Sequence, residues 1–156
     1  MPPTDPYAAQ RQRLQALLDT MPPVAALGLA VDGLDDRCLR LVAPLSRNVN
    51  DKGCAFGGSL ASALTLAAWG ALETALHHVG EDVDIYVADS RLEYLAPLYG
   101  DLLVEAAMPD AEAVAALCGK LAARGRGGLV MAAEARDAAG RVVTRLEGRY
   151  AAVRRG

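Results

Sequence analysis

A short polar segment before a long apolar run holds the residue types best suited to chemistry in this chain. It contains the only two asparagines, Asn48 and Asn50, which are followed by Asp51, and it ends at Gly57-Gly58. Side-chain amides and carboxylates can hold a polar ligand group or a water molecule by hydrogen bonds. Asparagine also tolerates left-handed turns and bonds its own backbone, so two turn-formers holding an irregular loop are an equally good interpretation.

The glycine pair stands where a helix is predicted to begin. The first backbone amides of a helix have no partner within it, and the helix dipole gives them a partial positive charge. Such amides suit an oxyanion or a thioester carbonyl. Glycines here would also permit close packing of helix on sheet, and the pair alone does not separate these alternatives. Its coincidence with the asparagines, Asp51 and Lys52 in one segment favours the binding interpretation.

One face of the predicted helix collects polar side chains. At 100° per residue, one side of the helix holds Gly58, Ser62, Thr65, Trp69 and Glu73. Buried hydroxyls commonly bond the carbonyls of the preceding turn, which requires no substrate, so a substrate-facing Thr65 remains one of two alternatives. Trp69 and Phe56 are expected in the core rather than as a ligand platform.

The other reactive side chains form no local catalytic signature. His77 and His78 are the only histidines and stand at the helix end, where a cation favours the dipole. Cys38, Cys54 and Cys118 are odd in number and form no Cys-x-x-Cys pair, which argues against a disulfide framework and a zinc site. We therefore expect no metal, no cofactor and a reducing cytoplasmic location.

The composition indicates one globular domain over residues 1–156. The chain is 53% hydrophobic and 22% charged, with a formal net charge of −3, and a chain of this length can bury a core without disulfides. The chain is mildly acidic and has no basic patch of the kind that nucleic-acid binders use, so DNA and RNA are not expected partners. We expect no signal peptide, because the N-terminus has no basic region followed by an apolar run. We expect no membrane contact, because the most apolar stretch, residues 60–72, is shorter than the roughly 20 residues of a membrane span.

The residue pattern predicts an α+β arrangement in which one long helix is held against a curved antiparallel sheet. A short amphipathic helix at about 7–19 should cover the domain and end at Met21-Pro22-Pro23. The long helix should run over residues 59–78 and close at Gly80. Residues 110–124 fit either a helix or a strand. Strands are predicted at residues 27–44 (a hairpin turning at 35–37), 83–95, 102–108, 129–136 and 142–153.

Two motifs resemble the YiiD C-terminal type of thioesterase domain, within the hotdog-fold thioesterase superfamily. The first is Asn48-x-Asn50-Asp51-Lys52-Gly53-x-x-Phe56-Gly57-Gly58-Ser59, and the second is Ala88-Asp89-Ser90-x-x-x-Tyr94-Leu95-x-Pro97 with Gly100-Asp101. The likeness covers nearly all of the chain from about Met21 onward. It implies the hotdog fold, a long central helix wrapped by a curved antiparallel sheet.

The resemblance also matches residues of this chain to site positions of the family. Better-known hotdog thioesterases have an Asn six residues before a His-Gly-Gly triplet and a helix carboxylate nine residues after that His. By this match Asn50 is the Asn, Phe56 replaces the His, Gly57 supplies the amide and Thr65 replaces the acid. Neither Phe56 nor Thr65 can act as a general base at neutral pH, so Asp51 and Asp89 become the base candidates. The alternative is a purely structural role, with Asp51 as a turn residue and Asp89 as a strand residue.

The expected function is hydrolysis of an acyl thioester, acyl-CoA above all, by attack of water. Relatives with this fold build the site between two subunits, so a homodimer or dimer of dimers is expected, and Asp89 would serve the other subunit's Thr65. A hydratase or dehydratase is a rival, as is a non-catalytic acyl-thioester binding or dimerisation module. The residues expected to contact substrate besides the catalytic set are Asn48, Phe56, Gly58, Ser59, Ser62 and Trp69.

Overall fold

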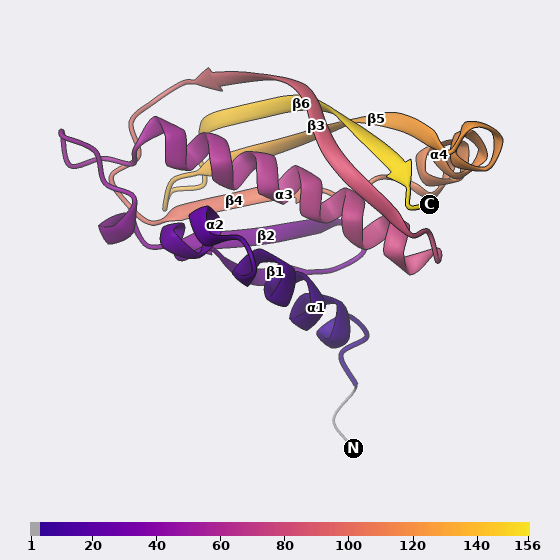
Figure 1. Cartoon of the computed structure of the whole chain (residues 1–156). Helices are drawn as coiled ribbons and strands as arrows, with labels where there is room; N and C mark the ends of the chain where they lie inside the picture. The colour runs from indigo at the N-terminus through magenta and orange to yellow at the C-terminus, as the bar shows by residue number, and fades with distance from the viewer. Residues whose placement is uncertain (1–3) are drawn as a thin grey trace.

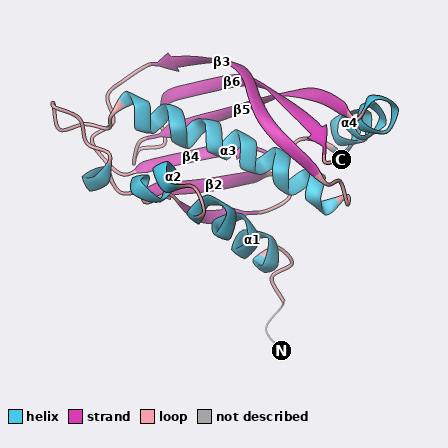
Figure 2. Cartoon of the chain, in the orientation of Figure 1, coloured by secondary structure: helices cyan, strands magenta, loops and turns pink. Residues whose placement is uncertain are grey.

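The computed structural model of the chain describes residues 4–156 as one antiparallel sheet curved around one long helix (Figures 1 and 2). The helix is α3, and two short helices cover it at the open side of the sheet while α4 lies near the C-terminus (Figure 1). In chain order the elements are α1 (Ala8–Asp19), α2 (Pro22–Leu27), β1 (Ala30–Leu34), β2 (Cys38–Ala43), the 3-10 turn η1 (Leu45–Arg47), α3 (Gly57–His78), β3 (Val83–Tyr94), β4 (Leu102–Ala107), α4 (Ala111–Arg124), β5 (Arg126–Arg136) and β6 (Val142–Arg154).

The six strands form a single sheet in the order β1-β2-β4-β5-β6-β3. Every neighbouring pair is antiparallel. β3 pairs with β6 along its whole length, from Val83 opposite Arg154 to Tyr94 opposite Thr144. Among residues 4–156 no strand pairs with the other side of β3, so β3 is a long edge strand.

The core lies between α3 and the concave face of the sheet. α3 is rich in alanine and leucine and buries residues such as Leu64, Ala68 and Leu72 completely. Strand residues alternate as a half-buried sheet requires, with Leu102, Val104 and Ala106 of β4 inward and their neighbours exposed. The predicted α+β hotdog architecture is therefore confirmed.

α1 closes the open side of α3. Its Leu14 and Leu18 are each 1% exposed, and Arg13 binds both carboxylate oxygens of Glu73 on α3, with N–O distances of 2.7 and 2.6 Å. Gly70 lies where α1 and β2 approach α3: a Cβ there would stand 2.9 Å from Leu39 and 3.3 Å from Leu14. The absence of a side chain thus lets three elements meet.

α3 is by length and composition able to cross a membrane. In the fold, 61% of its most apolar window is buried inside the protein. Its apolarity is that of a core helix surrounded by α1 and the sheet.

Several element boundaries differ from the sequence prediction. Pro22 and Pro23 end α1 as expected but also begin α2, which was not predicted; proline is favoured in a first helical turn because its missing N–H has no helical acceptor there. α3 begins at Gly57, two residues early. Residues 111–124 are helical, because Asp110 caps them by accepting the amide of Ala113 at 2.7 Å and Gly125 ends them with φ of +71°.

Replacing Leu14 by alanine should lower the free energy of unfolding by about 2–5 kcal/mol, because a fully buried leucine loses its contacts with α3. Leu17, which is only partly buried, provides the control, and Leu17→Ala should cost clearly less. Urea denaturation of both variants measures the difference. Equal losses would show that α1 does not pack through Leu14.

Candidate functional site

The polar segment before α3 is a loop held together by its own asparagines. Asn48 is 2% exposed, and its Nδ2 donates to the carbonyls of Leu27 and Pro44, both at 2.8 Å. Its backbone carbonyl accepts the amide of Phe56 at 2.7 Å. Asn48 thus ties the end of α2 to the loop and fixes the start of α3. Its expected contact with a substrate stays a prediction.

Asn50 organises the tip of the same loop. Its Oδ1 accepts the amides of Lys52 at 2.8 Å and Cys54 at 3.2 Å, and Gly53 has the positive φ of +81° that the turn needs. Asp51 is 81% exposed at this tip and pairs with the Lys52 ammonium at 2.8 Å. Both asparagines therefore hold the loop as turn-formers do, and the loop carries Asp51 away from the helix.

The first turn of α3 lacks a side-chain cap. Phe56 occupies the N-cap position without a side-chain cap, so its side chain accepts no hydrogen bond from the first amides of Gly57 and Gly58. The hydroxyl of Tyr94, from the end of β3, donates to the Gly57 carbonyl at 3.0 Å and fixes this turn against the sheet. The sequence motif contained Tyr94, but only the antiparallel return of β3 reveals this contact.

Two cavities flank the helix start. The larger, about 570 Å³, lies between α2 and α3 and brings together five residues expected at the site: Phe56, Gly58, Ser59, Ser62 and Thr65. Its remaining wall is mostly hydrocarbon from Pro23, Val24, Leu27 and Leu66. The smaller, about 330 Å³, lies on the other side of the helix and is lined by Gly57, Leu60 and the segment from Tyr94 to Leu98. Gly57 and Thr65 thus line different hollows within one subunit.

The expectation that Phe56 is a core residue is wrong, because its side chain is 55% exposed. The Phe56 ring leans over Gly58, where an added Cβ would lie 2.5 Å from it. It therefore forms part of the wall of the larger cavity. Core packing is already complete beneath it through Leu60 and Leu64.

The hydroxyl-bearing residues of α3 differ in their surroundings. Ser62 donates to the Gly58 carbonyl at 2.9 Å, the back-bonding alternative considered from the sequence. Ser59 is 5% exposed. Thr65 is half-buried and lines the cavity, and its carbonyl accepts the hydroxyl of Tyr150 at 2.8 Å. Burial raises the pKa of Tyr150 strongly, so this phenol remains a hydrogen-bond donor.

Trp69 belongs to the core, as expected. It is partly buried against the core cluster, and its indole nitrogen donates to the Ile85 carbonyl of β3 at 3.2 Å. It lines neither cavity at the helix start. Its proposed contact with a substrate stays a prediction.

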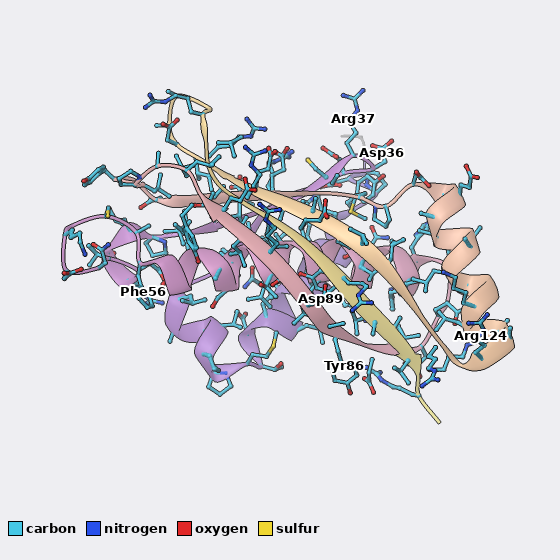
Figure 3. The ribbon with its side chains drawn as sticks, turned by 90° about the horizontal axis from the view of Figure 1, so that it is seen from above. Asp36, Arg37, Phe56, Tyr86, Asp89 and Arg124 are labelled. Carbon is cyan, nitrogen blue, oxygen red and sulfur yellow. The ribbon has the colours of Figure 1, made fainter. Side chains whose placement is uncertain are left out.

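Asp89 lies on the outer face of the sheet. It stands opposite Arg149 in the β3–β6 register and forms an ion pair with it. The neighbours of Arg149, Gly148 and Tyr150, are buried toward α3, so alternation along the strand places Arg149 and Asp89 on the opposite face. Figure 3 shows Asp89 on the sheet, well apart from Phe56 at the loop. Asp89 therefore does not face the cavities of its own subunit.

No carboxylate lines either of the two cavities at the helix start. Glu73, on the same helix, is held by Arg13. Among the residues that the structure describes, no cluster of three or more His, Cys, Asp and Glu side chains could hold a metal ion. Within one subunit the arrangement offers amide donors, hydroxyls and apolar walls, and the charged groups lie outside it.

Solved structures with the same fold cover nearly the whole chain. A protein of unknown function from Chlorobaculum tepidum is 27% identical, with a TM-score of 0.89 over 93% of this chain and 94% of that one. A structure described as a putative thioesterase from Shewanella oneidensis is 25% identical, with a TM-score of 0.82 over 93% and 98% of the two chains. A thioesterase from Haemophilus influenzae, 14% identical with a TM-score of 0.69 over 92% and 90% of the two chains, shares the fold.

Curated protein sequences gave no match. A family model described as "Putative thioesterase (yiiD_Cterm)" matches residues 11–154, which includes the loop, α3 and all six strands. The chain therefore belongs to this thioesterase family.

Proposed function

We propose that the protein hydrolyses acyl thioesters, with acyl-CoA as the substrate, by direct attack of water. The observation that carries the proposal is the open start of α3, where uncapped amides stand between two cavities. Membership of the thioesterase family supports it. The hydrocarbon wall of the larger cavity suits an aliphatic acyl chain.

In the proposed reaction the Gly57 amide donates to the thioester oxygen. Water adds to the carbonyl carbon and gives a tetrahedral intermediate, whose negative oxygen is stabilised by that amide and the helix dipole. Collapse of the intermediate breaks the carbon–sulfur bond and releases thiolate and carboxylic acid. Gly58, Ser62 and Thr65 line the larger cavity, so water held there would approach the carbonyl from the side of the helix start opposite the smaller cavity, which Gly57 lines. Asn50 supports the loop that positions the helix start.

The proton from the attacking water needs a base, for which we propose Asp89 of a second subunit, with Asp51 as the alternative. Asp89 faces away from its own α3, and Asp51 is at an exposed tip. A site made by two copies would supply the carboxylate that one copy lacks. The long unpaired edge of β3, where Tyr86 is 59% and Val87 45% exposed, favours a homodimer formed through that strand. Pairing of two β3 edges keeps Asp89 on the outer face of the extended sheet, so Asp89 would reach another copy's helix start only where two such dimers pack together, in the dimer of dimers.

A non-catalytic acyl-thioester binding module is the second candidate. Phe56 and Thr65 stand where relatives carry a histidine and an acid, and no carboxylate lines the two cavities. Both candidates place the thioester at the same helix start. They differ in turnover alone.

The three cysteines are free thiols in the structure, and a reducing cytoplasmic location remains part of the proposal.

Asp89→Asn, Asp51→Asn and Thr65→Val should be assayed separately for thiol release from acyl-CoA of varied chain length. Loss of the true base should lower kcat by about 10²- to 10⁴-fold, and loss of a positioning hydroxyl should cost less. Glu112→Gln, on the exposed surface of α4, is the matched control and should be unaffected. If both aspartate variants keep full turnover, water activation by these residues is refuted. If the native protein binds acyl-CoA but does not turn it over, the non-catalytic binding module is favoured.

Gly57→Ala should fold normally and lower kcat/KM by about tenfold or more. Its added Cβ would lie 3.4 Å from the Tyr94 ring, an ordinary contact, while the methyl would stand in the path of the thioester carbonyl to the amide. Gly119→Ala, which meets nothing within 4 Å on α4, is the control and should leave kcat/KM unchanged. Normal kinetics in folded Gly57→Ala would show that the thioester carbonyl does not bind at this amide.

Light scattering at micromolar concentration should give at least twice the chain mass of 16.3 kDa, because pairing through β3 would cover its unpaired backbone groups. Val87→Lys should weaken the assembly by placing a charge on the edge strand, whereas Val130→Lys, on the exposed face of β5, should not. A monomeric native protein with full activity would contradict the two-subunit site.

A further inference from the structure

A separate cavity lies at the opposite end of α3. It has a volume of about 430 Å³ and is enclosed by α1, the last turn of α3, α4 and the β1–β2 turn. Thr74 of its wall is 17 residues beyond Gly57, which corresponds to about 25 Å along a helix axis. It therefore shares no wall with the cavities at the helix start.

Most of this wall is hydrocarbon. Val79 from α3, Met108 and Pro109 after β4, and Val114 and Ala115 from α4 line it. The volume falls within the range of about 300–1,000 Å³ that is usual for small-molecule sites. The cavity can thus hold a ring or a branched aliphatic group of moderate size.

The polar lining residues are two aspartates and five further side chains, Tyr7, Gln10, Thr74, His78 and Cys118. The aspartates are Asp35 and Asp36, and no lysine or arginine is among the lining residues. Arg37 belongs to the same turn but points away from the molecule (Figure 3). Burial and then the charges of Asp36 and Asp35 raise the pKa of Tyr7, which also lines the cavity, as a negative local potential would.

The two aspartates are engaged to different degrees. One Asp35 oxygen accepts the amides of Arg37 and Cys38, at 2.8 and 2.9 Å, and the other lies 3.7 Å from the Arg40 guanidinium. Asp35 is therefore committed to the turn. Asp36 is exposed and forms none of the ion pairs found among residues 4–156, so its charge is available to a ligand.

Gln10 adds an acceptor that lacks a donor. Its Oε1 is buried without a hydrogen-bond partner among the described residues, while its Nε2 lies 3.3 Å from His78 Nδ1. Both Gln10 and His78 line the cavity. Because this oxygen is shielded from solvent, it lies behind the cavity wall and is not an exposed contact for a ligand.

We propose that this cavity binds a small organic ammonium ion with an aromatic or branched hydrocarbon body. The body would lie against Val79, Met108 and Val114, and the ammonium group would donate toward the Asp36 carboxylate. Hydrocarbon walls favour the body, and the acidic lining favours a cation over a neutral or anionic ligand of the same shape. The site lies apart from the proposed thioester site and does not depend on it.

Isothermal titration of the full chain with three indole probes tests the charge preference. Tryptamine is cationic, tryptophol replaces its ammonium by a hydroxyl, and indole-3-acetate is anionic. Tryptamine should bind with a dissociation constant of about 0.1 mM, as a ligand of this size allows. Tryptophol should bind about tenfold more weakly, and indole-3-acetate should show no binding. Equal affinity for tryptamine and tryptophol, or no binding of tryptamine, overturns the proposal.

Matched variants test the location. Asp36→Asn should weaken tryptamine about three- to tenfold without changing tryptophol, whereas Asp32→Asn, an exposed acid on β1 outside the cavity, should change neither. Ala115→Trp, on the exposed side of α4, should fill the cavity and abolish binding of both probes while circular dichroism stays native. Equal effects of the two aspartate variants, or undiminished binding to folded Ala115→Trp, overturn the assignment.

Discussion

Burial of α3 is the constraint on which the rest of the structure depends. Its apolar surface extends around the helix, so one flat partner could not cover it. The sheet curves around one side, and α1 closes the other through Leu14, Leu18 and the pairing of Arg13 with Glu73. Gly70 permits the close approach of these layers. The stability of each element is therefore coupled to the same helix.

The ends of α3 cannot be buried in the same way, because their backbone groups lack helical partners. At the N-terminal end the protein provides no side-chain cap; it leaves two hollows and holds the turn through Tyr94. At the C-terminal end, α4 and the β1–β2 turn enclose a different cavity with an acidic lining. The two ends thus present different chemistry on one rigid element, which is a consequence of covering a long helix with a sheet of finite width.

The carboxylates of one subunit lie away from its own helix start for two structural reasons. Strand alternation sends Asp89 to the outer face of the sheet because the inward positions of β6 beside it are used by Gly148 and Tyr150. The loop tip sends Asp51 into solvent because Asn50 uses its side chain to close the turn. A single subunit therefore offers donors and apolar walls at the helix start but keeps its carboxylates elsewhere.

The sequence by itself determined the periodicities, and with them the long core helix, the strand order along the chain and the glycine pair at the helix start. It also identified the family, because Asn48 to Ser59 forms a compact motif in consecutive residues. Only the tertiary structure decided that Phe56 is exposed, that the side chains of Asn48 and Asn50 bond backbone groups of the loop and its neighbours, and that Asp89 faces outward. These properties depend on which distant backbone groups and strands come to lie beside each residue, and local sequence does not encode such long-range neighbours.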